Sequence, residues 1–347
     1  MDKLLVSLLL VIMVLLVLLF SMFFLLVFYR MQEVKSKKKI KEYIEDRKGD
    51  WYEYLLGEGM RIEDLKPNGS LEHKAIDELF FRFSYHFTSD EINERINAFA
   101  ALYMSDYYNK DLSSRSSGVR INTLNKISLY NLTFMLEPVS KILRKKKVYP
   151  KAEYLLLYEI IIKFSRTDFV AHFIHPKVTL GEFDYKKLLL ELDETQISLL
   201  AEDFTVLPDM LKLTLIEIVG VRHYLDWLPL LHECLDSPAQ ELRIRALKSI
   251  AELEVADADA LKLYEGFSYS DVWEERLMTA KIFRSAPTEE ALPVLKHLIK
   301  DSTYPVRAQA AKSMKSLKNG QQALYSVITT SSDEFAVDVA EEMFGKE

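Results

Sequence analysis

The sequence predicts an all-α protein in which pairs of helices stack on one another behind a single transmembrane helix. Three observations support this fold class. Glycine and proline number only 10 each among 347 residues, too few for the many turns of a β-sandwich or barrel. An uncharged apolar run opens the chain, and a two-helix pattern returns about every 31 residues toward its end. The single cysteine, Cys234, excludes a disulfide framework within one chain.

Residues 1–29 are the predicted membrane anchor. The run from Leu4 to Phe28 holds 25 residues without a charge, and 21 of them are Leu, Ile, Val or Phe. As a helix it is about 37 Å long, enough to cross a hydrocarbon core of about 30 Å. A secretory signal peptide is the alternative, but its apolar region spans about 7–15 residues and ends at small residues. Bulky Phe28 and Tyr29 end this longer run, so the sequence favours a retained single-pass anchor.

Residues 30–50 are a basic juxtamembrane segment. Five net positive charges lie between Arg30 and Lys41, although the whole chain has a net charge of −7. Because positive flanks stay in the cytoplasm, we expect the N-terminus outside a bacterial inner membrane and the rest of the chain in the cytoplasm. Ammonium groups close to a span attract anionic lipid headgroups. The predicted lipid contacts are Lys35, Lys37, Lys38, Lys39 and Lys41.

Residues 51–192 are predicted to form diverged helical pairs in which the repeat is blurred. Tyrosines and phenylalanines between Phe80 and Tyr108 recur at helical spacing, which is more typical of a core than of a base-stacking platform. A polar loop is expected around 111–120. The basic run 144–147 has two interpretations, either a solvated helix end or a contact for lipid or an acidic partner.

Residues 193–347 carry the clear repeat. Arg307 opens an alanine-rich helix, and Arg276, Arg243 and Lys212 hold the equivalent place at intervals of 31, 33 and 31 residues upstream. A second apolar helix precedes each of the three arginine-headed helices. A unit of two helices cannot bury its apolar face alone, whereas stacked neighbours bury it for each other. The sequence therefore predicts an α-α superhelix, or α-solenoid.

One segment is specific enough to suggest a family. ALPVLKHLIKDSTYPVRAQAAKSMKSL, residues 291–317, resembles a bacterial HEAT repeat in its Leu-Pro start, its turn aspartate and its Val-Arg-x-x-Ala second helix. The resemblance implies that turn aspartates and helix arginines form hydrogen bonds that tie adjacent repeats together. The implied pairs are Asp301 with Arg307, Asp236 with Arg243 and, more loosely, Arg276 with Asp271. These arginines are then structural rather than ligand-binding.

The second helices of HEAT arrays line a concave face, and basic residues recur along the corresponding helices here. One interpretation is that these charges only keep the protein soluble. The more specific hypothesis is that they line a groove for an acidic peptide or loop of a protein partner. The candidate partner-binding residues are Arg245, Lys248, Lys281, Arg284, Lys312 and Lys315.

The sequence contains few motifs for catalysis or for cofactor binding. It has no P-loop, no Gly-x-Gly-x-x-Gly and no His-Glu-x-x-His, so we expect no catalytic residue and no cofactor. Asp168, His172 and His175 are spaced to share one helix face, but a helix-end histidine pair explains them without a metal. The acidic body is a poor match for nucleic acid.

The expected function is therefore that of a membrane-tethered cytoplasmic scaffold or adaptor. It would bind membrane-associated protein partners through its solenoid, as an accessory to a membrane complex such as one of envelope or polysaccharide assembly. The alternative, implied by the resemblance alone, is a HEAT-fold enzyme of the lyase or DNA-glycosylase type.

Overall fold

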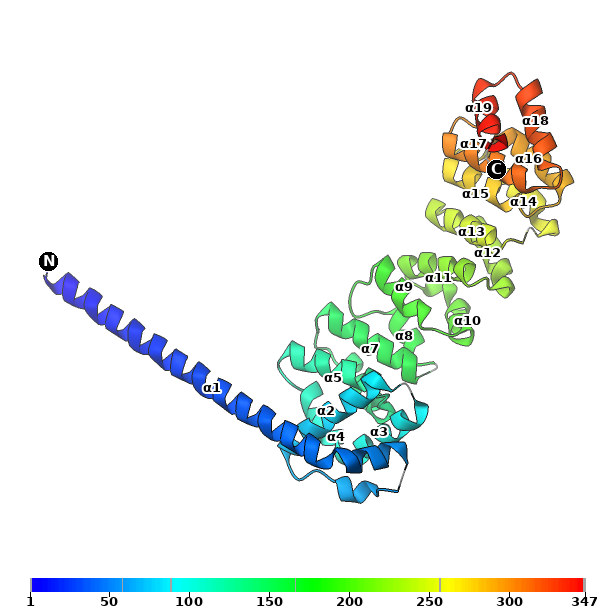
Figure 1. Cartoon of the computed structure of the whole chain (residues 1–347). Helices are drawn as coiled ribbons and strands as arrows, with labels where there is room; N and C mark the ends of the chain where they lie inside the picture. The colour runs from blue at the N-terminus through cyan, green and yellow to red at the C-terminus, as the bar shows by residue number, and fades with distance from the viewer. Residues whose placement is uncertain (1, 58, 88, 166, 256, 346–347) are drawn as a thin grey trace. The chain divides into compact units, whose positions relative to one another are not determined.

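The computed structural model describes residues 2–57, 59–87, 89–165, 167–255 and 257–345. These residues form nineteen α-helices and six short 3-10 helices, and no β-strand occurs among them (Figure 1). The all-α prediction is thus confirmed. Contacts divide the chain into two units, residues 1–166 and residues 167–347, and each unit is described by itself. The predicted change in repeat regularity after Leu192 lies inside the second unit.

The first unit contains seven α-helices and two 3-10 helices. Their bounds are α1 Asp2–Leu56, η1 Ile62–Leu65, α2 Ser70–His86, α3 Asp90–Tyr103, α4 Ser105–Leu112, α5 Ser117–Leu129, η2 Thr133–Met135, α6 Leu136–Arg144 and α7 Lys151–Phe164. Packing joins α1 to α2 and α3, α4 to α5, α5 to α7, and α6 to α7.

The first helix is unbroken over 55 residues and projects from the rest of its unit as a straight rod (Figure 1). The apolar side chains described between Leu10 and Tyr29 are exposed. By length and composition α1 can cross a membrane, a property that signal sequences share. The far end of α1 is different, because Ile44, Trp51 and Leu55 are buried against the unit.

Aromatic packing attaches the far end of α1 to the helices that follow it. The Trp51 ring lies edge-on to Phe80 and Phe99, with ring centroids 5.6 and 4.9 Å away. Arg95 on α3 donates a hydrogen bond to the carbonyl of Leu55 at 2.6 Å, which satisfies one of the open carbonyls at the end of α1. The aromatic residues Phe80, Phe99 and Tyr108 are therefore core residues.

The second unit contains twelve α-helices and four 3-10 helices. Their bounds are α8 Phe169–Ile174, α9 Glu182–Leu190, α10 Glu194–Glu202, η3 Phe204–Val206, α11 Asp209–Val221, η4 Leu225–Trp227, α12 Leu228–Leu235, α13 Gln240–Glu252, η5 Ala258–Ala260, α14 Leu261–Gly266, η6 Phe267–Tyr269, α15 Trp273–Ile282, α16 Thr288–Leu298, α17 Tyr304–Ser316, α18 Gly320–Thr330 and α19 Glu334–Phe344.

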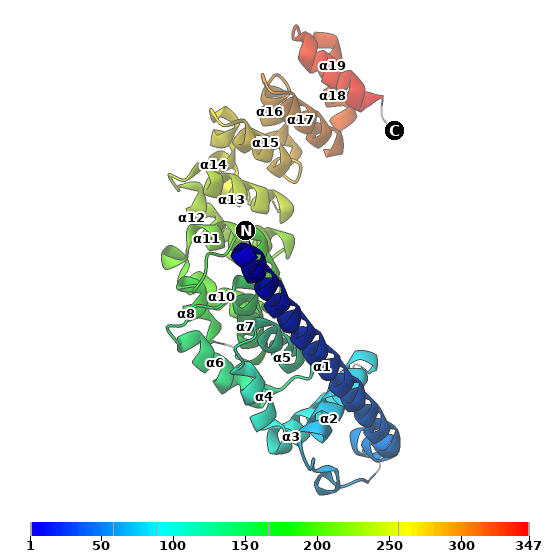
Figure 2. The same ribbon diagram turned by 90° about the vertical axis from the view of Figure 1, so that its left-hand side faces the viewer.

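Alternate helices of the second unit form one row. Helix α9 packs on α11, α11 on α13, α13 on α15, α15 on α17 and α17 on α19 (Figure 2). The helices between them, α12, α14, α16 and α18, each pack against the member of the row that follows. From α11 onward, the row consists of the second helices of the predicted pairs, so residues at matching positions on α13, α15 and α17 come to lie beside one another.

Helices α11 and α13 of this row approach each other closely. A Cβ atom added to Gly220 on α11 would lie 2.7 Å from the Cα of Ser249 on α13, so no larger residue fits there without movement. The Ser249 hydroxyl donates to the carbonyl of Ile216 at 2.8 Å. Glycine and serine at this crossing therefore let the two backbones approach.

Candidate functional site

Three arginines at the heads of second helices close the turns that precede them. The Nη1 atoms of Arg243, Arg276 and Arg307 each donate to the carbonyl six residues earlier, at 2.9, 2.7 and 2.7 Å. The accepting carbonyls belong to Ser237, Ser270 and Asp301 in the same order. The guanidinium group thus satisfies turn carbonyls that the helices leave open.

Two of these arginines also reach a carboxylate of the next helix pair. The Nε of Arg243 donates to Glu275 at 2.8 Å, and Arg276 binds both oxygens of Asp301 at 2.5 and 3.0 Å. The resemblance to a HEAT repeat implies the pair Asp301 with Arg307 and, more loosely, Arg276 with Asp271. The geometry instead places the Asp301 carboxylate on Arg276, whereas Arg307 donates to the backbone carbonyls of Asp301 and Ser302.

The implied pair of Asp236 with Arg243 is replaced in the same way. Asp236 is exposed in its turn, and the carboxylate that Arg243 contacts is that of Glu275. The physical reason is that the next helix pair, rather than the arginine's own turn, presents a carboxylate to the guanidinium Nε.

Arg307 contacts no such carboxylate within the part of the chain that the structure describes. Its guanidinium carbon lies 5.2 Å from the ring centroid of Phe335 and 5.9 Å from that of Tyr304. The Nε atom is buried without a hydrogen-bond partner among the described residues. The series of arginine–carboxylate ties therefore ends at Arg307, where an aromatic ring takes the place of the acid.

A fourth arginine of this kind, Arg120, escaped the sequence analysis. Its Nη1 donates to the Ser114 carbonyl six residues earlier at 2.7 Å, and its Nε and Nη2 donate to Glu153 on α7 at 2.7 and 2.6 Å. Both side chains are buried. The signal that could have revealed it is the Val-Arg dipeptide, which follows a polar turn just as Val306-Arg307 does.

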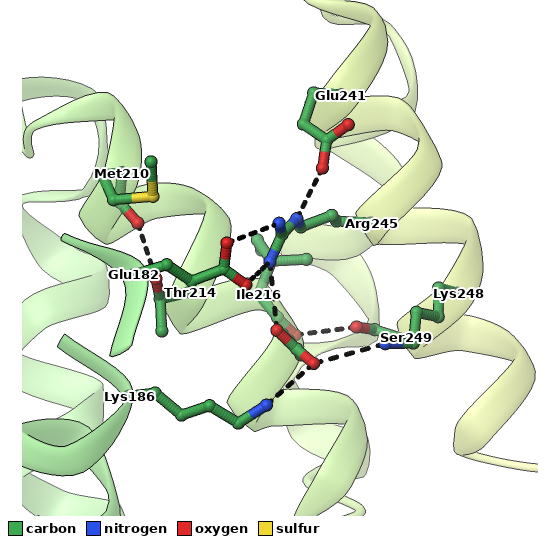
Figure 3. Close-up of polar contacts among 10 residues, drawn as sticks. Glu182, Lys186, Met210, Thr214, Ile216, Glu241, Arg245, Lys248 and Ser249 are labelled. Atoms are coloured by element: carbon green, nitrogen blue, oxygen red, sulfur yellow. Dashed lines mark hydrogen bonds and ion pairs between the residues drawn. The ribbon is translucent and has the colours of Figure 1, made fainter. Parts of the chain in front are cut away.

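Arg245 and Lys248, two of the six predicted partner-binding residues, belong to a network of ion pairs centred on Glu217 of α11. Lys248 lies 3.2 Å from a Glu217 oxygen and Lys186 of α9 lies 3.1 Å from it (Figure 3). Arg245 donates to Glu182 at 2.8 Å, to Glu217 at 3.0 Å and to Glu241 at 2.8 Å. Arg245 is thus committed to its own unit rather than open to a partner.

The pKa of Glu217 reflects the three cations that surround its carboxylate. Burial alone would raise the pKa of its carboxyl, but the hydrogen bonds and charges of Lys186 and Lys248 outweigh it and hold the pKa below its ordinary value. Glu217 is therefore ionised at neutral pH, and its charge offsets part of the positive charge around it.

Four of the six predicted partner-binding residues line one groove in the second unit. The groove has a volume of about 480 Å³. Three neighbouring helices of the row and the turn after α15 build its cationic wall, which consists of Lys248, Lys281, Arg284 and Lys312. The remaining two residues, Arg245 and Lys315, are not part of its lining.

The groove also contains two acids and an imidazole. Glu252 and Glu254 line it together with His223, and Arg284 is paired with Glu254. Lys281 and Lys312 form no ion pair among the described residues. The groove thus keeps a net positive charge, which suits it to bind an anionic group.

The remaining predicted sites are not part of the lining of this groove. Lys35, Lys37, Lys38, Lys39 and Lys41 are all exposed along α1, with Lys37 paired to Glu33 at 2.6 Å. Helix α8 covers only Phe169–Ile174, so Asp168 and His175 are its two caps rather than members of one helix face. Among the described residues no group of three His, Cys, Asp or Glu side chains is placed to hold a metal ion.

The one cysteine is not set up as a nucleophile. Cys234 is buried, and burial raises the pKa of its thiol to about 11. The thiol is therefore protonated at neutral pH, and the thiolate is the reactive form.

Comparisons with known proteins name no family. No protein-family model matches the sequence, and no curated protein matches it. Among solved structures, the crystal structure of an engineered protein is similar over 82 % of this chain and 83 % of that chain, at 16 % sequence identity and a TM-score of 0.26. A TM-score this low supports no argument about fold or function.

Proposed function

We propose that this protein is a membrane-tethered scaffold that binds an acidic segment of a partner protein. In this proposal the first half of α1 is a single-pass anchor in a bacterial inner membrane. The helix pairs form a HEAT-like α-solenoid in the cytoplasm, and the partner belongs to a membrane complex. The observation that carries the proposal is the groove in which three successive helices of one row each contribute a lysine, namely Lys248, Lys281 and Lys312. Arg284, in the turn after α15, adds a fourth cation.

The groove fits an extended peptide better than a compact ligand. Its lining runs from α11 to α17, which are three helix spacings apart, or about 27 Å at 8–10 Å per spacing. An extended strand rises about 3.3 Å per residue, so about eight residues would reach along it. Each helix would then meet the peptide about every third residue, which favours a partner segment with acids at that interval.

Tethering compensates for weak binding. Exposed ion pairs contribute only about 0.2–1 kcal/mol each, so a few pairs give a modest affinity that salt lowers further. Confining scaffold and partner to one membrane raises the effective concentration of each for the other. A weak, charge-selective groove is therefore useful in a protein held at the bilayer.

The continuity of α1 supports the tether. The helix runs without a break from the apolar stretch into the first unit, and Ile44 is the first of its described side chains that is buried. Between Tyr29 and Ile44 lie 15 helical steps, so about 22 Å of helix separates the apolar stretch from the first residue that packs against the unit. Lys35 is about 9 Å from Tyr29 along the helix, close to the Debye length at physiological salt, and the later lysines lie progressively farther from the headgroups.

The test is binding of a defined peptide to the full chain in lipid nanodiscs. The probe is a fluorescent octapeptide with four glutamates, read by anisotropy, and its glutamine counterpart is the blank. Charge reversal at Lys248, Lys281 and Lys312 should weaken binding more than about tenfold while helicity measured by circular dichroism stays the same.

A matched control reverses three exposed lysines that do not line the groove, Lys262, Lys296 and Lys318. This variant has the same net charge as the groove variant and should bind almost as the wild type does. Equal losses in the two variants would show that the whole body attracts the peptide and that the groove does not.

A further inference from the structure

A second cationic cavity lies in the first unit, between the α4–α5 turn and α6. Its volume is about 810 Å³, which is in the range of small-molecule sites. Five cations contribute to its wall, and one carboxylate faces them. These residues are Arg120, Lys141, Arg144, Lys145, Lys147 and, as the acid, Glu137.

The positive charge of this cavity is only partly neutralised from within. Arg120 is compensated by Glu153, so it is a fixed part of the wall. Glu137 is shared between Arg144 at 3.1 Å and Lys141 at 3.7 Å. Lys145 and Lys147 have no carboxylate partner among the described residues, and the Lys147 ammonium lies 5.1 Å from the Tyr149 ring centroid. Two cationic groups therefore remain available.

Both lysines follow the end of α6. Helix α6 ends at Arg144, and Lys145 has φ and ψ angles of −66° and 148°, so the chain leaves the helix there. Lys145 and Lys147 line the cavity, whereas Lys146 between them does not.

We propose that this cavity binds a small ligand carrying phosphate groups, either a free molecule or the headgroup of a lipid. A phosphate has several charged oxygens that can accept from more than one cation at once, and guanidinium and ammonium groups are its usual partners. Asn109, Ser113 and Ser114 also line the cavity and add amide and hydroxyl groups. The site is independent of the acidic-peptide groove, since no residue is common to both linings.

The experiment is calorimetric titration of the full chain with inorganic pyrophosphate, in nanodiscs of phosphatidylcholine. The variant Lys145→Gln/Lys147→Gln should bind at least about tenfold more weakly than the wild type, because each lost cation removes a charge-assisted hydrogen bond. The control Lys146→Gln changes an exposed lysine of the same segment and should stay within about twofold of the wild type. Circular dichroism checks that all three proteins are folded.

The second arm separates the two sources of phosphate. The same titration is repeated in nanodiscs that contain phosphatidylglycerol. Weaker pyrophosphate binding there, in the wild type but not in the double variant, would identify a lipid headgroup as the competitor and natural occupant. Equal affinity in both lipids would identify a free phosphorylated molecule. Absence of pyrophosphate binding in phosphatidylcholine, or an equal loss in Lys146→Gln, would overturn the proposal.

Discussion

Replacing Glu153 with leucine should destabilise the first unit strongly, because the change leaves the Arg120 charge buried without its partner. The Glu153 carboxylate is 2 % exposed and accepts three hydrogen bonds, two from Arg120 at 2.6 and 2.7 Å and one from Ser117 at 2.6 Å. Removing one partner of a buried pair typically costs about 3–5 kcal/mol. That is a large fraction of the about 5–15 kcal/mol that stabilises a typical domain.

The double variant Arg120→Met/Glu153→Leu should recover most of this loss. Replacing a whole buried ion pair by apolar groups of similar size is often close to neutral, since neither charge is then left desolvated. In the wild type, Arg120 also donates a hydrogen bond to the Ser114 carbonyl. The double variant loses this bond, so it should remain slightly less stable than the wild type. The coupling between the two positions in a double-mutant cycle should therefore be several kcal/mol.

The assay is hydrogen exchange measured by mass spectrometry on the full chain, with peptides from α5 and α7 as the local probes. Local probes are needed because the chain has two units and a single unfolding midpoint would mix them. The matched control is Glu78→Leu, which removes an ion pair to Arg82 that is nearly half exposed on α2 and should cost about 0–1 kcal/mol. Equal destabilisation by both leucine variants, or a cycle with no coupling, would refute the reasoning.

Three further predictions follow from the packing and the charges. Gly220→Ala should cost about 1–3 kcal/mol because its Cβ would collide with Ser249, whereas Gly266→Ala meets nothing within 4 Å and should be neutral or stabilising by up to about 1 kcal/mol; equal urea midpoints for the two variants would contradict the close contact. The folded-state pKa of Glu217 lies below its ordinary value of 4.5, so the unfolded chain takes up the proton first as pH falls. The stability due to Glu217 should therefore be complete above about pH 4.5 and lost as pH falls through the folded pKa, and urea titrations should show a smaller acid dependence in Glu217→Gln. Trp51→Ala should cost about 3–5 kcal/mol and expose the end of α1 to limited proteolysis, and unchanged protease resistance would argue against the aromatic attachment.

Local patterns in the sequence were sufficient for the helices and for the arginines that head them. The spacing of apolar residues around Arg243, Arg276 and Arg307 depends only on neighbours within a few turns of one helix, and these helices form as expected. The acid partners depend on which part of the next helix pair packs against each arginine. Asp301 is six residues from Arg307 but 25 from Arg276, and its carboxylate nevertheless pairs with Arg276.

The candidate site shows the same limit. Regular spacing of lysines along the repeat placed Lys248, Lys281 and Lys312 on neighbouring helices, and these three line one groove. The same spacing gave no sign that Arg245 is occupied, since one of its partners, Glu182, lies 63 residues away on α9. Arg120 was overlooked because the repeat around it is blurred and its carboxylate partner belongs to another helix.

The measurement that tests the central claim most directly is site-specific photo-crosslinking in intact cells. A photoreactive residue replaces Lys281 in the groove or, as the control, Lys296 on α16 outside it, and each is placed in the full chain and in a chain lacking residues 1–29. The account predicts adducts from position 281 alone, in the full chain alone, and with the crosslink mapped to an acidic stretch of a membrane-associated protein. The same adducts from position 296, or undiminished adducts without the anchor, would contradict it.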